Sequence, residues 1–193
     1  MLTLKKALES NLTLNLLASA LVVCLAGFFW VDLSRGLEII GINQIIRIAV
    51  VGIGILSIYL IWKRVFQTLP ILYLVFTGCY FLYQLLFLNT YPMYLIMILL
   101  FLLIWLIFPI YQVKEAHGIY FFLLVLTLFE IFLALGYWLV NPISRSLIMA
   151  IAAYLFGGWL TTMADKDRRD FSRYLYFSTI SFLIVLFTTR WGI

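Results

Sequence analysis

The chain has 193 residues, of which 66% are hydrophobic, 18% aromatic and only 11% charged. Water-soluble domains average about 45–50% apolar and about 25% charged residues, so this composition excludes a water-soluble fold. A membrane-spanning helix uses about 20 apolar residues, and seven of them would use roughly 140 residues. What remains is enough for short tails and connections but not for an extramembrane domain. We therefore expect one polytopic membrane domain over residues 1–193.

Seven apolar stretches follow one another along the chain, each about long enough to cross a bilayer as a helix. Proline stands at the start of the third and fourth stretches, where a first helical turn tolerates it. Pro109 lies in the last turns of the fourth stretch and should kink or end it. The predicted spans are about 12–31, 43–62, 69–88, 92–112, 119–140, 146–163 and 174–190.

Two segments near the N-terminus have more than one interpretation. Residues 32–44 mix apolar with charged side chains, which is consistent with a short amphipathic helix in the outer interface and equally with a direct continuation into the second span. Lys5 and Lys6 precede an apolar stretch, as in a secretory signal. Because the apolar stretch continues unbroken to Val31, we expect an uncleaved first span.

Lysine and arginine are distributed unequally over the two ends of the spans. With a cytoplasmic N-terminus, the cytoplasmic side holds Lys5, Lys6, Lys63, Arg64, Lys114, Lys166, Arg168, Arg169 and Arg173, and the other side holds Arg35, Arg47, Arg145 and Arg190. This bias follows the positive-inside rule, and most of the tryptophans lie near span ends, as membrane tryptophans do. The sequence therefore predicts an all-α integral membrane protein, a seven-helix transmembrane bundle with the N-terminus cytoplasmic and the C-terminus outside.

Glu130 is the acidic residue closest to the middle of a predicted span. An acidic residue at the bilayer centre costs about 2.5–3.5 kcal/mol on insertion scales. We therefore expect its side chain to point into the bundle, where it makes a structural hydrogen bond, handles a solute or proton, or contacts a partner. The candidates at similar depth for interaction with it are Thr77, Tyr80, Ser178, Thr179 and Ser181, with Arg47 reaching down from the outer side or extending outward to the interface.

The spans differ in the size of their side chains. Ala150, Ala153 and Gly157 recur at helical spacing in the sixth span, and small residues let membrane helices approach one another. We expect this span to be the most enclosed, with a solute path along its small residues as the alternative. The fourth span, residues 92–112, has no Gly, Ala, Ser or Thr and is typical of a lipid-facing helix. Three tyrosines share one face of the third span, an arrangement more typical of packing than of binding: Tyr73, Tyr80 and Tyr83.

The chain carries no catalytic signature. The single histidine, His117, lies in a predicted loop, and no motif for hydrolysis or for phosphate or metal binding occurs. Cys24 and Cys79 lie inside spans without metal-ligand spacing, so neither a metal nor a cofactor is predicted. A charged loop interleaves three acids with three cations, which is typical of a solvated loop. A lipid-modifying enzyme that uses Asp165, Asp167 and Asp170 is a distant alternative.

The leading hypothesis is a small integral membrane protein that acts as a binding, accessory or assembly subunit, through intramembrane helix packing with a protein or lipid partner. The alternative is a small permease or solute-binding membrane protein, proton-coupled or not, that uses Glu130 as an intramembrane recognition or coupling group. Nucleic acid is not an expected partner, because the basic residues lie in short loops. The compact form suits a bacterial plasma membrane.

Overall fold

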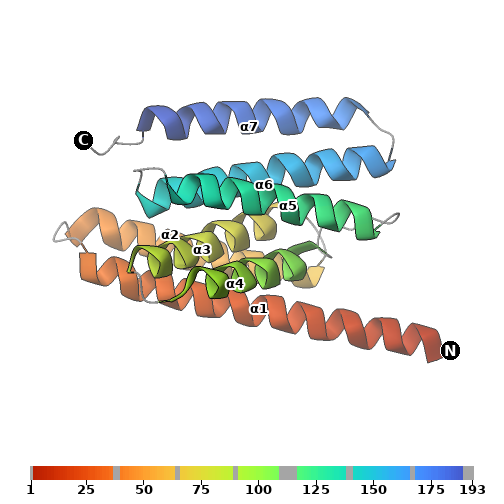
Figure 1. Cartoon of the computed structure of the whole chain (residues 1–193). Coiled ribbons are helices and arrows are strands. Elements are labelled where there is room, and N and C mark those ends of the chain that lie inside the picture. Colours follow the sequence, from red (N-terminus) through yellow and green to blue (C-terminus); the bar gives the residue numbers. More distant parts are fainter. Residues whose placement is uncertain are drawn as a thin grey trace. The chain divides into compact units, whose positions relative to one another are not determined.

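The computed structural model shows seven helices and no strand among the residues that it describes (Figure 1). The backbone is described for residues 2–36, 40–63, 66–88, 91–108, 117–137, 141–165 and 168–188, and side chains for 12–32, 44, 47–63, 66–88, 91–108, 119, 121–137, 141–160, 162 and 172–187. The helices are α1 (Leu2–Gly36), α2 (Ile40–Lys63), α3 (Thr68–Phe87), α4 (Met93–Ile107), α5 (His117–Gly136), α6 (Pro142–Asp165) and α7 (Arg168–Thr188).

Three helical segments are long and apolar enough to cross a membrane: Leu12–Asp32, Thr68–Phe87 and Pro142–Leu160. Shorter apolar helices cover Met93–Ile107, Phe121–Gly136 and Ser172–Phe187. The predicted all-helical character is therefore confirmed for the described residues. The crossing of a bilayer by all seven helices, with the chain ends on opposite sides, stays a prediction.

Several helix ends differ from the predicted spans. The described part of α4 ends at Ile107 rather than at 112, and α5 ends at Gly136 rather than at 140. A proline cannot donate a backbone hydrogen bond, which explains an end of α4 before Pro109. Pro109 itself lies outside the described residues. Conversely, α7 begins at Arg168, well before 174, because charged residues can occupy a helix that extends beyond an apolar core.

The described residues of 32–44 belong to the two neighbouring helices. α1 continues to Gly36 and α2 begins at Ile40, while residues 37–39 lie outside the described residues. Of the two interpretations that the sequence left open, the structure favours continuation of the helices over a separate interfacial helix.

α6 begins at a capping sequence that the predicted span, starting at 146, did not include. Asn141 Oδ1 accepts hydrogen bonds from the backbone N–H groups of Ile143 at 2.7 Å and Ser144 at 3.1 Å. Pro142 occupies the first helical position, where its missing N–H group is not needed. The Asn-Pro pair thus sets the start of the helix.

Replacing Asn141 by alanine is expected to lower the free energy of unfolding by about 0.5–2 kcal/mol, because two backbone donors of α6 lose their acceptor. The measurement is thermal unfolding of the purified protein in detergent, followed by circular dichroism. Asn141→Ser is the matched control, since serine also caps helices well. Equal losses for the two variants would contradict a capping role.

The chain forms two compact units, residues 1–74 and 75–193, and α3 crosses the boundary between them. We call these the first unit and the second unit. Whether they make up one polytopic domain stays a prediction.

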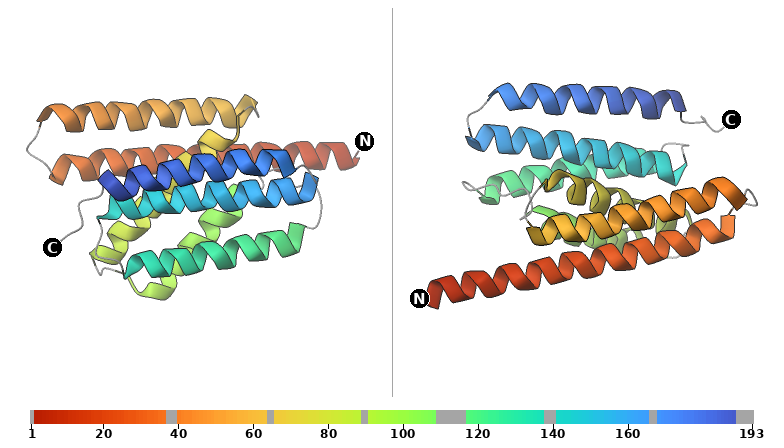
Figure 2. Two further views of the ribbon diagram at one scale, coloured as in Figure 1. Left: turned by 90° about the horizontal axis from the view of Figure 1, so that it is seen from above. Right: turned by 180° about the vertical axis from the view of Figure 1, so that it is seen from behind.

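In the first unit, α1 and α2 run antiparallel and lie side by side (Figure 2). Buried positions recur three and four residues apart on both helices, the spacing of a coiled-coil seam. They are Ala18, Val22, Leu25 and Phe29 on α1 and Val50, Gly54, Ser57 and Ile61 on α2. Trp62 Nε1 also donates a hydrogen bond to Ser19 Oγ at 3.1 Å. Small residues in this seam let the two backbones approach closely, as membrane helices do.

In the second unit, α6 lies between α5 and α7 (Figure 1). The expectation that the sixth span is the most enclosed is nevertheless wrong. In α3, 61% of the most apolar 18-residue window is buried, against 44% in α6. The predicted tyrosine face explains the difference, because Tyr73, Tyr80 and Tyr83 are all buried on α3. Large rings can enclose a helix as fully as small residues can.

The expectation that α4 is a lipid-facing helix does not hold for all of its faces, because one face is buried. Ile96, Leu100, Leu103 and Ile107 form part of a buried face. The close approach comes from the neighbouring helix: a Cβ atom at Gly78 of α3 would lie 2.7 Å from Leu103 Cδ2. The small residue that lets α3 and α4 approach closely therefore belongs to α3. Because α4 itself contains no small residue, its composition alone predicted a lipid-facing helix.

Candidate functional site

Glu130 lies on the exposed side of α5. The buried residues Leu124, Leu128 and Phe132 mark the inward face of this helix. Because each residue advances about 100° around an α-helix, Glu130 is roughly 200° from Leu128. The expectation that this side chain points into the bundle is therefore wrong for the second unit. With the other described residues, Glu130 makes no hydrogen bond or ion pair.

The predicted partners of Glu130 are not gathered around it. On α3, Thr77 and Tyr80 are buried, and Tyr80 Oη accepts a hydrogen bond from Gln84 Nε2 at 2.9 Å. On α7, Ser178 is buried and Ser181 is half-buried, whereas Thr179 is exposed and donates to the carbonyl of Leu175 at 2.8 Å. Most of these polar groups therefore lie within the packed second unit, whereas Glu130 is exposed.

Arg47 has a local partner in the first unit. Its guanidinium carbon lies 5.7 Å from the centre of the Trp30 ring, which places the cation against the negative face of the aromatic system. The pair joins the C-terminal part of α1 to the N-terminal part of α2. Both residues lie near the predicted outer ends of their spans, where Trp and Arg anchor helices at the interface.

A polar cluster in the second unit surrounds Tyr83. The Tyr83 ring stacks on Phe132 with centroids 4.4 Å apart and planes 12° from parallel, and its hydroxyl donates to the Phe132 carbonyl at 3.2 Å. The Arg145 guanidinium carbon lies 5.7 Å from the Tyr83 ring, and Arg145 Nη1 donates to the Gly136 carbonyl at 3.4 Å. A cation at the C-terminal end of a helix is favourable.

This cluster ties α3, α5 and α6 together. It consists of a phenol, a guanidinium group and backbone carbonyls, and its contacts hold the three helices against one another. Sequence reasoning placed Tyr83 on a packing face but missed Arg145, because the sixth span was expected to begin after it. The signal that would have placed Arg145 inside a helix is the Asn-Pro capping sequence just before it.

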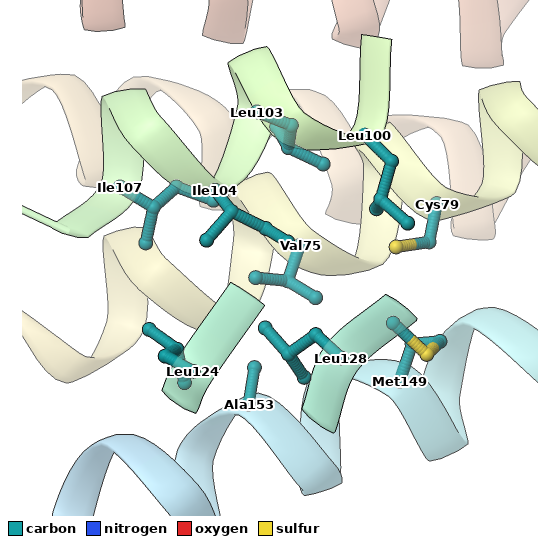
Figure 3. Close-up of a pocket in the computed structure, with 10 residues that line it drawn as sticks. All are labelled: Val75, Cys79, Leu100, Leu103, Ile104, Ile107, Leu124, Leu128, Met149 and Ala153. Carbon is teal, nitrogen blue, oxygen red and sulfur yellow. The ribbon is translucent and has the colours of Figure 1, made fainter. Parts of the chain in front are cut away.

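A cavity in the second unit is lined by side chains of α3, α4, α5 and α6 (Figure 3). Its volume is about 10 Å³, enough for one water molecule at most. The lining consists of carbon and sulfur, with Cys79 and Met149 supplying the two sulfur atoms. Without polar groups such a space stays dry, so it is a packing defect and not a binding site for a polar solute.

The small residues predicted for helix packing lie on buried positions of α6. Ala150, Ala153 and Gly157 are buried, and Ala153 lines the apolar cavity. The closest approach to α7 occurs at the next residue, since a Cβ atom at Gly158 would lie 2.3 Å from Cγ and Cδ1 of Tyr174.

Aromatic rings surround this glycine contact. The Tyr154 ring on α6 lies 5.0 Å from the Tyr174 ring and 5.1 Å from the Phe177 ring of α7. Aromatic pairs at such distances add to the stability of an interface. The α6–α7 contact thus combines a glycine with three rings, and the sequence pattern of small residues did not identify it.

The residues of the distant enzymatic alternative lie outside the described side chains, so this alternative stays untested. Asp165 ends α6 and Asp170 lies in the first turn of α7, while Asp167 and the side chains of both these residues lie outside the described residues. The side chains that are described include no group of three or more His, Cys, Asp or Glu that could hold a metal ion.

Comparison with known proteins found no matching family model, no matching curated protein and no matching solved structure.

Proposed function

We propose that this chain is a multi-pass membrane protein whose seven helices all cross a bilayer, with the N-terminus cytoplasmic and the C-terminus outside. We further propose that it acts without catalysis, as a binding, accessory or assembly subunit that packs against a protein or lipid partner. A bacterial plasma membrane is the proposed location.

The apolar outer surface of the helices carries this proposal. Only 22% of the Leu12–Asp32 window is buried. On α4, α5 and α7, large apolar side chains such as Trp105, Phe122 and Ile180 are exposed. Extensive exposed apolar surface marks contact with a membrane or a partner.

Helix length also supports seven spans. α3, α5 and α7 contain 20, 20 and 21 residues. At about 1.5 Å per residue, such helices are roughly 30 Å long, which is the thickness of the hydrocarbon core. The apolar parts of α5 and α7, Phe121–Gly136 and Ser172–Phe187, are shorter than the whole helices. Over the described residues, α4 has 15 residues and is the shortest helix; a short span is accommodated by local thinning of the bilayer at a modest cost.

The permease alternative has no supporting observation among the described residues. An intramembrane carboxyl that couples or recognises a solute should line an internal polar cavity. The cavity described above, lined by α3, α4, α5 and α6, is apolar, and Glu130 lies on the exposed face of α5.

Reporter fusions test the topology. A reporter active only outside the cytoplasm should be active when fused after Leu88, Tyr137 or Thr188 and inactive after Lys63, Phe108 or Asp165; a cytoplasmic reporter should give the opposite pattern. The control is the same reporter fused to a soluble cytoplasmic protein. Both chain ends on one side of the membrane would overturn the proposed topology.

The accessory role is tested separately, by purification in a mild detergent and mass spectrometry of co-purifying molecules. A stoichiometric membrane protein or lipid is the expected companion, with a second copy of the chain counted as a protein partner. A stoichiometric polar solute, lost when Glu130 is replaced by glutamine, would overturn the proposal in favour of the permease.

A further inference from the structure

The register of the α1–α2 pair fixes which residues of the two helices lie at the same depth. Near one end of the pair, Trp62 Nε1 donates a hydrogen bond to Ser19 Oγ at 3.1 Å. Near the other end, the Arg47 guanidinium carbon lies 5.7 Å from the centre of the Trp30 ring. Tryptophan and cations mark the interfaces of a membrane. The pair therefore has two interface levels, one at Ser19 and one at Trp30.

These two levels are closer together than an average hydrocarbon core is thick. On α2, Arg47 and Lys63 are 16 positions apart, which is about 24 Å along the helix axis. On α1, Ser19 and Trp30 are 11 positions apart, which is about 16 Å. An average hydrocarbon core is about 30 Å thick. The pair thus places its interface residues for a thinner layer.

The backbone that follows Lys63 sets the cytoplasmic boundary more strictly than the lysine side chain does. α2 ends at Lys63 and α3 begins at Thr68. Between them, Phe66 is outside both helices, has a φ of 48° and is 78% exposed. Irregular backbone that faces lipid does not occur within hydrocarbon, because its polar groups would find no partner there. The hydrocarbon must therefore end near Lys63, at the depth of Ser19.

α1 continues past this level. Figure 2 shows its N-terminal part extending beyond the end of α2. The apolar segment Leu12–Asp32 begins seven positions before Ser19, about 10 Å along the axis. Apolarity alone places Leu12 and Leu16 within the hydrocarbon, whereas the register with α2 places them on its cytoplasmic side. Both side chains are about half exposed, at 52% and 50%.

We propose that the α1–α2 pair fits a hydrocarbon layer only about 24 Å thick, bounded by Arg47 and Lys63, and that the residues of α1 before Ser19 lie in the cytoplasmic headgroup region. The lipid partner is then a thin bilayer of phospholipids with short acyl chains. This inference rests on the membrane placement proposed above and states which lipids suit it.

α4 of the second unit fits such a layer independently. Its helix runs from Met93 to Ile107, between Pro92 at the N-cap and Phe108 at the C-cap. These 15 residues make a helix about 22 Å long. A short helix cannot lengthen to cross a thicker layer, whereas a longer helix such as α3 fits a thin layer by tilting. The shortest helices therefore set the thickness that suits the protein.

Cysteine labelling tests the cytoplasmic boundary. In a Cys24→Ser/Cys79→Ala background, either Leu16→Cys or Ile55→Cys is introduced, and open membrane fragments are treated with a membrane-impermeant maleimide. Leu16→Cys should react at least about tenfold faster than Ile55→Cys, because the reacting thiolate requires water. Ile55 is the matched control, since it is 65% exposed and lies midway between the two boundary residues of α2. A hydrocarbon layer that began at Leu12 would make both sites unreactive.

Lipid chain length tests the thickness. The protein is reconstituted in phosphatidylcholine vesicles with dimyristoleoyl, dipalmitoleoyl, dioleoyl or dierucoyl chains, and thermal unfolding is followed by tryptophan fluorescence. The unfolding midpoint should be highest with the short dimyristoleoyl chains and a few degrees lower with dioleoyl and dierucoyl chains, because mismatch between helix and bilayer costs free energy.

Substitution of Arg47 tests its place as the outer boundary. Arg47→Leu extends the apolar segment of α2 outward as far as Gln44, by about 4–5 Å, and should move the highest unfolding midpoint to longer lipid chains. Arg47→Lys keeps the charge and should leave the preferred chain length unchanged. Because the readout is the preferred chain length, a general loss of stability does not imitate it.

The inference is overturned if Leu16→Cys is as unreactive as Ile55→Cys, if the native chain is most stable with dioleoyl or dierucoyl chains, or if Arg47→Leu and Arg47→Lys prefer the same lipid. The reporter fusions distinguish this failure from failure of the proposed membrane placement. Any of these results in a chain with alternating topology contradicts the thin layer alone, whereas a chain without that topology contradicts the placement on which the thin layer depends.

Discussion

Replacing Gly158 by alanine is expected to lower the free energy of unfolding by about 1–3 kcal/mol, the usual cost of overpacking a close contact. The new Cβ atom would lie 2.3 Å from Cγ and Cδ1 of Tyr174, so α6 and α7 must move apart or the ring must turn. The ring cannot turn freely, because it packs 5.0 Å from the Tyr154 ring. Thermal unfolding in detergent, followed by tryptophan fluorescence, measures the loss.

Two variants control for the change of residue type. Gly52→Ala on α2 has no atom within 4 Å of the new Cβ, and it should leave stability unchanged or raise it slightly, since alanine is the better helix former. The second control measures Gly158→Ala in a chain that already carries Tyr174→Ala. The loss of stability caused by Gly158→Ala should be smaller there than in the native chain, because the ring that the new Cβ atom meets is gone. Additive losses in the double variant would contradict a steric origin.

Replacing Phe132 by alanine is expected to lower the free energy of unfolding by about 3 kcal/mol. In water-soluble cores the substitution costs about 3–5 kcal/mol, part of it from the transfer of apolar atoms out of water. In a bilayer that part is reduced, because lipid is as apolar as the protein interior. The packing loss remains: Phe132 is fully buried, and Tyr83 stacks on its ring at 4.4 Å.

Phe187→Ala is the matched control, since this phenylalanine on α7 is 86% exposed. Its replacement should change stability by less than about 0.5 kcal/mol, as for most surface positions. Both proteins are compared by chemical and thermal unfolding in the same detergent. Losses of equal size at the two positions would show that the Tyr83–Phe132 stack makes no special contribution.

Most of the helical architecture follows from composition and local signals. Apolar stretches of about 20 residues predict helices wherever a bilayer is the solvent. The predicted spans agree with the helices to within a few residues where the apolar stretch and the helix end at the same place, as at both ends of α3, Thr68 and Phe87. The start of α6 was missed because Asn141 and Pro142 lie outside the apolar stretch. A helix includes its capping turn, whereas hydropathy counts only the part that enters the hydrocarbon.

The orientation of Glu130 could not be obtained in this way. Its position along α5 is a matter of counting residues, but its direction depends on the rotation of the helix about its own axis. In a water-soluble helix the apolar stripe reveals that rotation. In α5, Leu126 on the exposed side and Leu128 on the buried side are the same residue type, so hydropathy contains no information on which side faces the protein.

The sequence by itself thus determined the helical class of the described residues, the approximate position of each helix and the place of Glu130 along α5, because these depend on local composition and on a fixed rise per residue. Only the tertiary structure decided which faces meet: Gly158 against Tyr174, Gly78 against Leu103, and Tyr83 on Phe132. Helices in lipid associate through close van der Waals fit and hydrogen bonds between distant segments, and that fit depends on the rotation and spacing of two helices at once.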